Sequence, residues 1–135
     1  MALTPFLTAW EPRVLGLLRF VSGVMFMLHG TQKLFGFPDA AAGGTGAPLM
    51  SKMGIAGLLE LVLGALIAVG LFTRVASFLA SGEMAVAYFT VHAPQNFWPT
   101  MNQGELAVVY CFLFFYFVFR GAGPWSLDAL FRRSV

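Results

Sequence analysis

The chain has 135 residues, of which 59% are hydrophobic and only 10% are charged, and its formal net charge at pH 7 is +2. A soluble domain carries roughly a quarter charged residues, so this composition excludes a disordered chain, a nucleic-acid binder with a basic face and most soluble enzymes. The lone cysteine, Cys111, excludes an intramolecular disulfide and a cysteine-based metal cluster. The length predicts a single domain over residues 1–135.

Four apolar stretches follow one another, at residues 14–28, 53–72, 75–91 and 106–119. A helix needs about 20 residues to cross the hydrocarbon core of a bilayer, and each stretch approaches that length once its flanking residues are included. Only helices and closed barrels satisfy their backbone groups in lipid, and these stretches lack the alternation of barrel strands. We therefore predict an all-α fold, an up-down bundle of four transmembrane helices.

The connecting segments agree with this bundle. Residues 37–51 and 93–103 are rich in glycine or proline, which is typical of loops. Residues 71–74 leave room only for a short turn, so the second and third helices should be adjacent and antiparallel. Apolar and aromatic residues followed by two arginines predict a short interfacial helix at residues 124–133, and residues 3–10 are expected to form a second surface-lying piece.

The positive residues segregate across the predicted topology. Five fall on the side of the termini and two on the other side: Arg13, Arg74, Arg120, Arg132 and Arg133 against Lys33 and Lys52. The positive-inside rule then predicts a multi-pass protein of the bacterial inner (cytoplasmic) membrane with both termini in the cytoplasm. A cleavable signal peptide is not expected, because Arg19 interrupts the first apolar stretch and no small-residue cleavage pattern follows.

Three ionisable residues, Arg19, Glu60 and Glu83, fall inside the predicted spans. A charge at the bilayer centre costs at least ~2.5–3.5 kcal/mol, so each of them needs a partner. The helical rise of about 1.5 Å per residue places Arg19 and Glu83 at similar depths, with Glu60 somewhat above them. We therefore expect Arg19 to pair with Glu83.

A second polar layer is predicted nearer the outer surface. It consists of four residues from the first helix and the start of the fourth: His29, Gln32, Lys33 and Glu105. Gly57 and Gly64 flank Glu60 at helical spacing, and small residues of this kind mark the packing faces of membrane helices. The polar groups should therefore meet along one interior seam of the bundle.

Two interpretations of this seam stay open. In the first, Arg19 and Glu83 form a buried ion pair that fixes helix register without any chemistry. In the second, one arginine cannot neutralise two carboxylates, so Glu60 or Glu83 holds an exchangeable proton and His29 adds a titratable group. No metal site is predicted, because His29 and His92 lack ligand spacing; a haem held by both histidines is a weaker alternative.

Short motifs in a fixed order give the chain a family resemblance. The motifs are Arg19 with Phe26 and His29-Gly30-x-x-Lys33-Leu34, Gly57-x-x-Glu60 with Gly64, Leu71-Phe72-Thr73-Arg74, Glu83-Met84, Asn102-x-Gly104-Glu105, and Gly123-Pro124 with Ser126-Leu127-Asp128. With these motifs in this order, the chain resembles the DoxX family of small bacterial membrane proteins. Trp125 stands where such proteins often have a further glycine.

The resemblance implies a four-helix membrane protein from a family named after a subunit of a quinone-linked thiosulfate oxidoreductase. The sequence has no flavin, haem, iron–sulfur or dithiol motif, so electron transfer would need a bound quinone or a partner that carries the cofactor. We expect a small inner-membrane subunit of a quinone-linked redox system. Glu60, Glu83 and His29 are its candidate catalytic residues, and Arg19, Lys33 and Glu105 its candidate ligand-binding residues.

Other functions are compatible with the same residues. The chain could be a non-catalytic accessory subunit that uses its aromatic fourth helix to dock on a larger membrane complex, or it could form a homo-oligomer. Oligomers with a small-molecule permeation pathway along the polar seam are a third possibility. Every one of these interpretations places the chain in contact with the lipid bilayer and none involves nucleic acid.

Overall fold

The computed structural model describes residues 3–39 and 46–133, and these ranges contain helices and no strand. The all-α prediction is therefore confirmed. Residues 40–45, part of the loop predicted at 37–51, lie outside the described residues. The helices in chain order are α1 (Leu3–Phe35), α2 (Lys52–Val69), α3 (Thr73–Ala87), the π-helical segment η2 (Tyr88–His92), α4 (Glu105–Arg120) and α5 (Leu127–Arg133).

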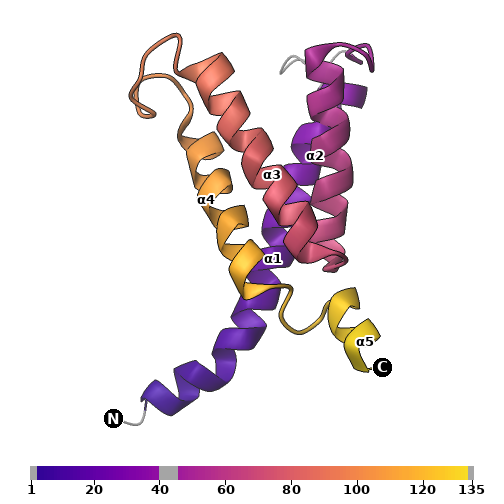
Figure 1. Cartoon of the computed structure of the whole chain (residues 1–135), viewed down its shortest axis with the longest axis vertical. Helices are drawn as coiled ribbons and strands as arrows, with labels where there is room; N and C mark the ends of the chain where they lie inside the picture. The colour runs from indigo at the N-terminus through magenta and orange to yellow at the C-terminus, as the bar shows by residue number, and fades with distance from the viewer. Residues whose placement is uncertain (1–2, 40–45, 134–135) are drawn as a thin grey trace.

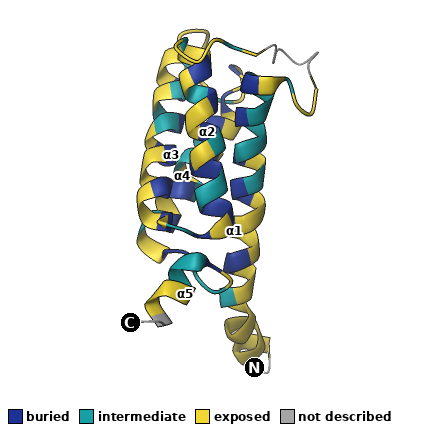
Figure 2. Ribbon diagram, turned by 90° about the vertical axis from the view of Figure 1, so that its right-hand side faces the viewer, coloured by how far each residue is buried: buried dark blue, intermediate teal, exposed yellow. Residues whose placement is uncertain are grey.

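The helices from α1 to α4 lie side by side (Figures 1 and 2). The α1 helix packs on α2, α3 packs on α4, and α2 contacts α3, as the short turn between them requires. Both termini, the α2–α3 turn and α5 lie at one end of the molecule, which we call the terminal end, and the two longer connections lie at the other (Figure 1). Among the described helices, α1 and α2 are long and apolar enough to cross a membrane.

The structure corrects three predicted boundaries. The predicted surface piece at residues 3–10 is continuous with α1, which has 33 residues and contains Pro12, and its N-terminal part extends beyond the other helices (Figure 1). The third predicted helix spans α3 and η2 together, from Thr73 to His92. The tail helix starts at Leu127 because Trp125 adopts a left-handed backbone conformation, with φ of 56°.

The turn between α2 and α3 is built on a left-handed glycine. Gly70 has φ of 70° and its N–H binds the Ile67 carbonyl at 3.1 Å, which is a common way to end a helix. The carboxylate of Asp128 in α5 accepts hydrogen bonds from the N–H groups of Phe72 and Thr73 at 2.8 and 2.9 Å. These bonds satisfy two free donors at the start of α3 and attach α5 to the turn.

The α1 and α2 helices approach each other closely through glycines. A Cβ atom on Gly30 would lie 2.5 Å from the Gly57 carbonyl oxygen and from the Leu61 nitrogen. One on Gly64 would lie 2.5 Å from the backbone nitrogen of Met27. Such contacts are too short for any side chain, so the backbones touch there. The packing face that the sequence predicts around Glu60 is confirmed.

The core lies where all four long helices meet. Its fully buried large apolar side chains are Phe26 of α1, Ile67 of α2, and Phe114 and Phe117 of α4. The Phe26 and Phe114 rings pack edge to face, with centroids 4.8 Å apart.

Candidate functional site

A cavity of about 230 Å³ lies between α1, α2, α3–η2 and the start of α4, toward the end with the long loops. Its polar lining comes from residues far apart in the sequence, and its walls are apolar. The polar lining residues are His29, Lys33, Glu60, His92, Gln103 and Tyr110, and the apolar ones are Phe26, Met84, Ala87, Leu106 and Ala107. A mostly apolar cavity with a few convergent polar groups is the usual form of a small-molecule site.

An ion pair between Lys33 and Glu60 lies in this cavity. The Lys33 Nζ atom donates to Glu60 Oε1, and Glu60 is only 3% exposed. The approach of α1 to α2 at Gly30 and Gly57 positions the pair, because Lys33 lies one turn beyond Gly30 and Glu60 lies one turn beyond Gly57. The second carboxylate oxygen of Glu60 is buried and has no hydrogen-bond partner in the described structure. It is available to a further donor.

Glu83 lies next to this pair and is unsatisfied. Both of its carboxylate oxygens are buried, and neither has a hydrogen-bond partner among residues 3–39 and 46–133. The charged groups that act on it most strongly are Glu60 and Lys33. Glu83 directly precedes Met84, which lines the cavity. One cation, Lys33, therefore lies near two carboxyl groups, those of Glu60 and Glu83.

The predicted Arg19–Glu83 pair is wrong. The Arg19 side chain is 1% exposed and donates to four backbone carbonyls from two parts of the chain. Its acceptors are Ile67 (2.7 Å) and Ala68 (2.5 Å) at the end of α2, and Ala122 (2.8 Å) and Trp125 (2.8 Å) between α4 and α5. The C-terminal end of a helix is its negative end, so backbone alone can partner this guanidinium. Arg19 is remote from the cavity lining and holds the terminal end together.

The predicted outer polar layer forms only in part. His29 and Lys33 line the cavity, but Lys33 pairs with Glu60, which was expected in a deeper layer. The four-carbon stem of a lysine lets its ammonium reach a depth other than that of its Cα, which the depth estimate ignored. Glu105 is exposed in the first turn of α4 and does not line the cavity.

The sequence interpretation missed Tyr110. Its side chain is 4% exposed, it lines the cavity, and its hydroxyl has no hydrogen-bond partner within the described chain. Its ring packs against His29 edge to face, with centroids 6.1 Å apart. A signal was present: the buried residues of α4, which include Ala107, Tyr110, Phe114 and Phe117, recur at helical spacing. A tyrosine on an otherwise apolar buried face marks a polar atom in the interior.

His92 closes the cavity on the side of η2. Its Nδ1 atom lies 3.0 Å from the Asn102 carbonyl oxygen, and Asn102 also binds the hydroxyl of Tyr88 at 3.3 Å. These bonds hold η2 against the segment that leads into α4. No group of three or more metal-ligating side chains exists in the described residues. The loose two-histidine haem alternative gains no support from the tethered His92 ring.

Comparison with known proteins identifies the family. The DoxX family model matches residues 14–93. The chain is similar to a protein of Haemophilus influenzae described as an uncharacterized protein, with 46% identity over 131 residues that cover 95% of this chain and 98% of the relative. No solved structure matches the chain. The chain belongs to the DoxX family.

Proposed function

We propose that α1, α2, α3 with η2, and α4 all cross the membrane. Each of them turns large apolar side chains outward, where a soluble protein would place polar ones. The outward residues include Phe20 and Val21 of α1, Leu58 and Val62 of α2, Phe78 and Val86 of α3, and Phe112 and Phe119 of α4, which are all at least 44% exposed. Residues 73–92 are helical throughout, close to the ~20 residues that a span needs.

The proposed orientation puts the terminal end in the cytoplasm of a bacterium, as the positive-inside rule predicts. Single cysteines tested with a membrane-impermeant thiol reagent, in a Cys111→Ser background, check it. Gln95→Cys, in the loop before α4, should be labelled from outside the inner membrane. Thr8→Cys, in α1, should be labelled only after the membrane is opened. Equal labelling of both in intact spheroplasts would contradict the topology.

Within this membrane protein, we propose that the cavity binds the head group of a quinone. The observation that carries the proposal is the convergence of unused polar atoms on one small cavity with apolar walls. The Tyr110 hydroxyl and the Lys33 ammonium would donate to an oxygen of the bound head group, and Phe26 and Leu106 would offer apolar surface to its ring. When bound, a quinone carries two electrons and two protons, and the electrons come from a partner protein.

The chain's own contribution is the handling of protons. Lys33 neutralises one carboxylate of the Glu60–Glu83 pair, so the other carboxyl holds a proton in the proposed resting state. His29 lies on the same cavity, about one turn before Lys33 on α1, and adds a further titratable group. In our proposal, Glu60, Glu83 and His29 together exchange protons with the bound head group. Arg19 and Glu105, which were expected to bind ligand, have no part in this proposal.

The first experiment measures binding of decylubiquinone to the protein in lipid nanodiscs by isothermal titration calorimetry. Tyr110→Phe removes one hydroxyl that has no hydrogen-bond partner among the described residues, so the fold should be unaffected. One hydrogen bond is worth about 1 kcal/mol, which corresponds to roughly fivefold weaker binding. The control is Tyr116→Phe, on an exposed position of the same helix, which should bind as the wild type does. Absence of saturable binding, or equal binding by Tyr110→Phe, would refute the quinone site.

The second experiment tests the proton role. The same titrations in buffers of different ionisation enthalpy report the number of protons exchanged on binding. Glu83→Gln keeps the size of the side chain and removes its proton exchange, so the buffer dependence should shrink. Glu105→Gln changes an exposed carboxylate and should leave the buffer dependence unchanged. A buffer dependence that is identical in the wild type and Glu83→Gln would contradict the role of Glu83.

A second candidate function is that of an accessory subunit. The observation that favours it is the exposed aromatic face of α4, with Phe112, Phe115 and Phe119 on its outward side. Such a face can contact either lipid tails or the helices of a larger complex. Purification in a mild detergent separates the two functions. A partner in stoichiometric amount supports the accessory role, and a free protein that binds decylubiquinone supports the quinone site.

A further inference from the structure

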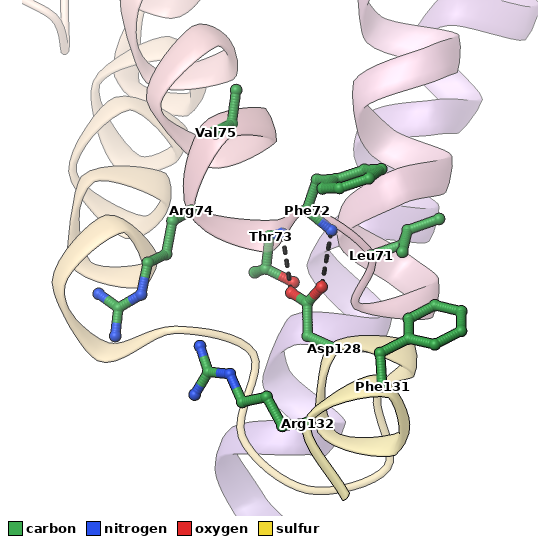
Figure 3. Close-up of a pocket in the computed structure, with 8 residues that line it drawn as sticks. All are labelled: Leu71, Phe72, Thr73, Arg74, Val75, Asp128, Phe131 and Arg132. Atoms are coloured by element: carbon green, nitrogen blue, oxygen red, sulfur yellow. Dashed lines mark hydrogen bonds between the residues drawn. The ribbon is translucent and has the colours of Figure 1, made fainter. Parts of the chain in front are cut away.

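We infer that the terminal end carries a binding site for one anionic phospholipid of the cytoplasmic leaflet. The site is an open hollow of about 580 Å³ between the α2–α3 turn, the start of α3 and α5 (Figure 3). Its lining combines two arginines with apolar side chains and one carboxylate: Leu71, Phe72, Thr73, Arg74, Val75, Asp128, Phe131 and Arg132. This inference rests on the proposed membrane placement and is independent of the quinone site.

The two arginines supply the charge that recognises a phosphate. Their guanidinium groups lie on the same side of the hollow, one from α3 and one from α5 (Figure 3). Arg74 is held by its Nη1 atom, which donates to the Val118 and Phe119 carbonyls at 2.6 and 2.7 Å. Its Nε and Nη2 groups make no hydrogen bond to the described residues and can still donate to a phosphate oxygen. A fixed planar fork of donors suits phosphate better than a flexible ammonium does.

The single carboxylate in the hollow does not cancel this charge. Asp128 accepts the N–H groups of Phe72 and Thr73, so its oxygens are turned to the start of α3 (Figure 3). Arg132 acts on Asp128 electrostatically but forms no hydrogen bond with it in the described structure. Two cations therefore face the hollow against one carboxylate that is already hydrogen-bonded. The surplus is one positive charge, which matches the single negative charge of an anionic diacyl phospholipid.

The apolar side of the hollow distinguishes a lipid from a free anion. Phe72, just before α3, is 67% exposed, and Val75, in the first turn of α3, is 63% exposed. In the proposed membrane placement both lie at the edge of the hydrocarbon region. Phe131 of α5 also lines the hollow and is 60% exposed. A phosphate held by Arg74 and Arg132 would have its acyl chains beside these residues. Basic groups next to exposed aromatic and aliphatic ones are the usual signature of contact with the membrane surface.

The test measures lipid retention by native mass spectrometry. The full chain is released from detergent micelles that contain equal amounts of phosphatidylglycerol and phosphatidylcholine of the same acyl length. We expect one phosphatidylglycerol to be retained in preference to phosphatidylcholine. Arg132→Gln should reduce its retention about fivefold, because one basic residue near a membrane surface contributes about that factor. Arg132 is exposed and forms no hydrogen bond with Asp128 in the described structure, so the thermal unfolding midpoint should change little.

Matched controls make the result specific. Arg13→Gln removes an exposed arginine of α1 near the same end of the molecule, and it should keep the wild-type retention. An equal loss in Arg13→Gln would show a general charge effect and would overturn the site, as would equal retention of both lipids. Displacement of phosphatidylglycerol by inorganic phosphate at millimolar concentration would overturn the assignment to a lipid. Tyr110→Phe should retain the lipid normally, which separates this site from the quinone cavity.

Discussion

The close approach of α1 and α2 makes a quantitative prediction about Gly30. In Gly30→Ala, the new methyl group would lie 2.5 Å from two backbone atoms of α2, where ordinary contact begins near 3.4 Å. The two backbones must therefore move apart by roughly 1 Å. Overpacking of this kind costs about 1–3 kcal/mol. The gain in helix propensity, about 1 kcal/mol for Gly→Ala, offsets part of that cost.

Gly82→Ala is the matched control, because a Cβ at Gly82 meets nothing within 4 Å. Both substitutions gain the same helix propensity, so the difference between them isolates the steric cost. In detergent, with unfolding by sodium dodecyl sulfate followed by circular dichroism, Gly30→Ala should be less stable than Gly82→Ala by about 1–3 kcal/mol. If the two variants unfold at the same detergent fraction, the helices are not in backbone contact, and our account of how Lys33 meets Glu60 fails.

Three further predictions concern charged residues. Arg19→Met should destabilise the fold by about 3–6 kcal/mol, because three buried carbonyls and one partly buried carbonyl lose a charged donor. Arg19→Lys should recover part of that loss. Detergent unfolding of both variants checks this, and equal stability of the two would contradict it. Lys33→Met should destabilise the fold by about 2–4 kcal/mol at neutral pH, because it leaves the Glu60 carboxylate buried without a cation. The double variant Lys33→Met with Glu60→Gln should regain most of that loss. If the stability losses of the two single variants simply add in the double variant, the two side chains do not interact. Partial burial alone would raise the pKa of Asp128, but hydrogen bonds from Thr73 and the preceding N–H, with a nearby arginine, outweigh it and hold the pKa below the usual 3.8. The stability that ionised Asp128 gives is therefore complete above pH 3.8 and is lost as the pH falls through the lower pKa of the folded state. The difference in melting temperature between the wild type and Asp128→Asn should shrink below pH 3.8. A difference that stays constant with pH would refute this.

The sequence alone predicted the helical architecture well because apolar length and turn residues are local properties. The short turn at residues 71–74 makes α2 and α3 neighbours, as the structure shows. The face around Glu60 was predicted from Gly57 and Gly64, since small residues at helical spacing have a direct steric meaning. The family resemblance was confirmed by the match to the DoxX model.

The charge partners could not be predicted from depth alone. The estimate treated each side chain as if its charge lay at its Cα, so Lys33 was assigned to a different layer from Glu60. It also considered only carboxylates as partners for Arg19. Backbone carbonyls at the end of α2 and around Ala122 have no sequence signature, because any residue supplies one. Tyr110 was overlooked among phenylalanines, although its hydroxyl makes it different from all of them.

The four bonds of Arg19 join α1 to the end of α2 and to the segment between α4 and α5. Two of the acceptors, Ala122 and Trp125, follow α4 in the chain, so they are translated after all four long helices. During synthesis the guanidinium therefore lacks two of its four acceptors until the segment after α4 has been made. A product that stops at Arg120 contains all four long helices but lacks the carbonyls of Ala122 and Trp125, so part of the Arg19 guanidinium has no acceptor. We expect such a fragment to be degraded in cells faster than the 135-residue chain. The burial of Arg19 would then make the stability of the fold depend on synthesis of the segment after α4.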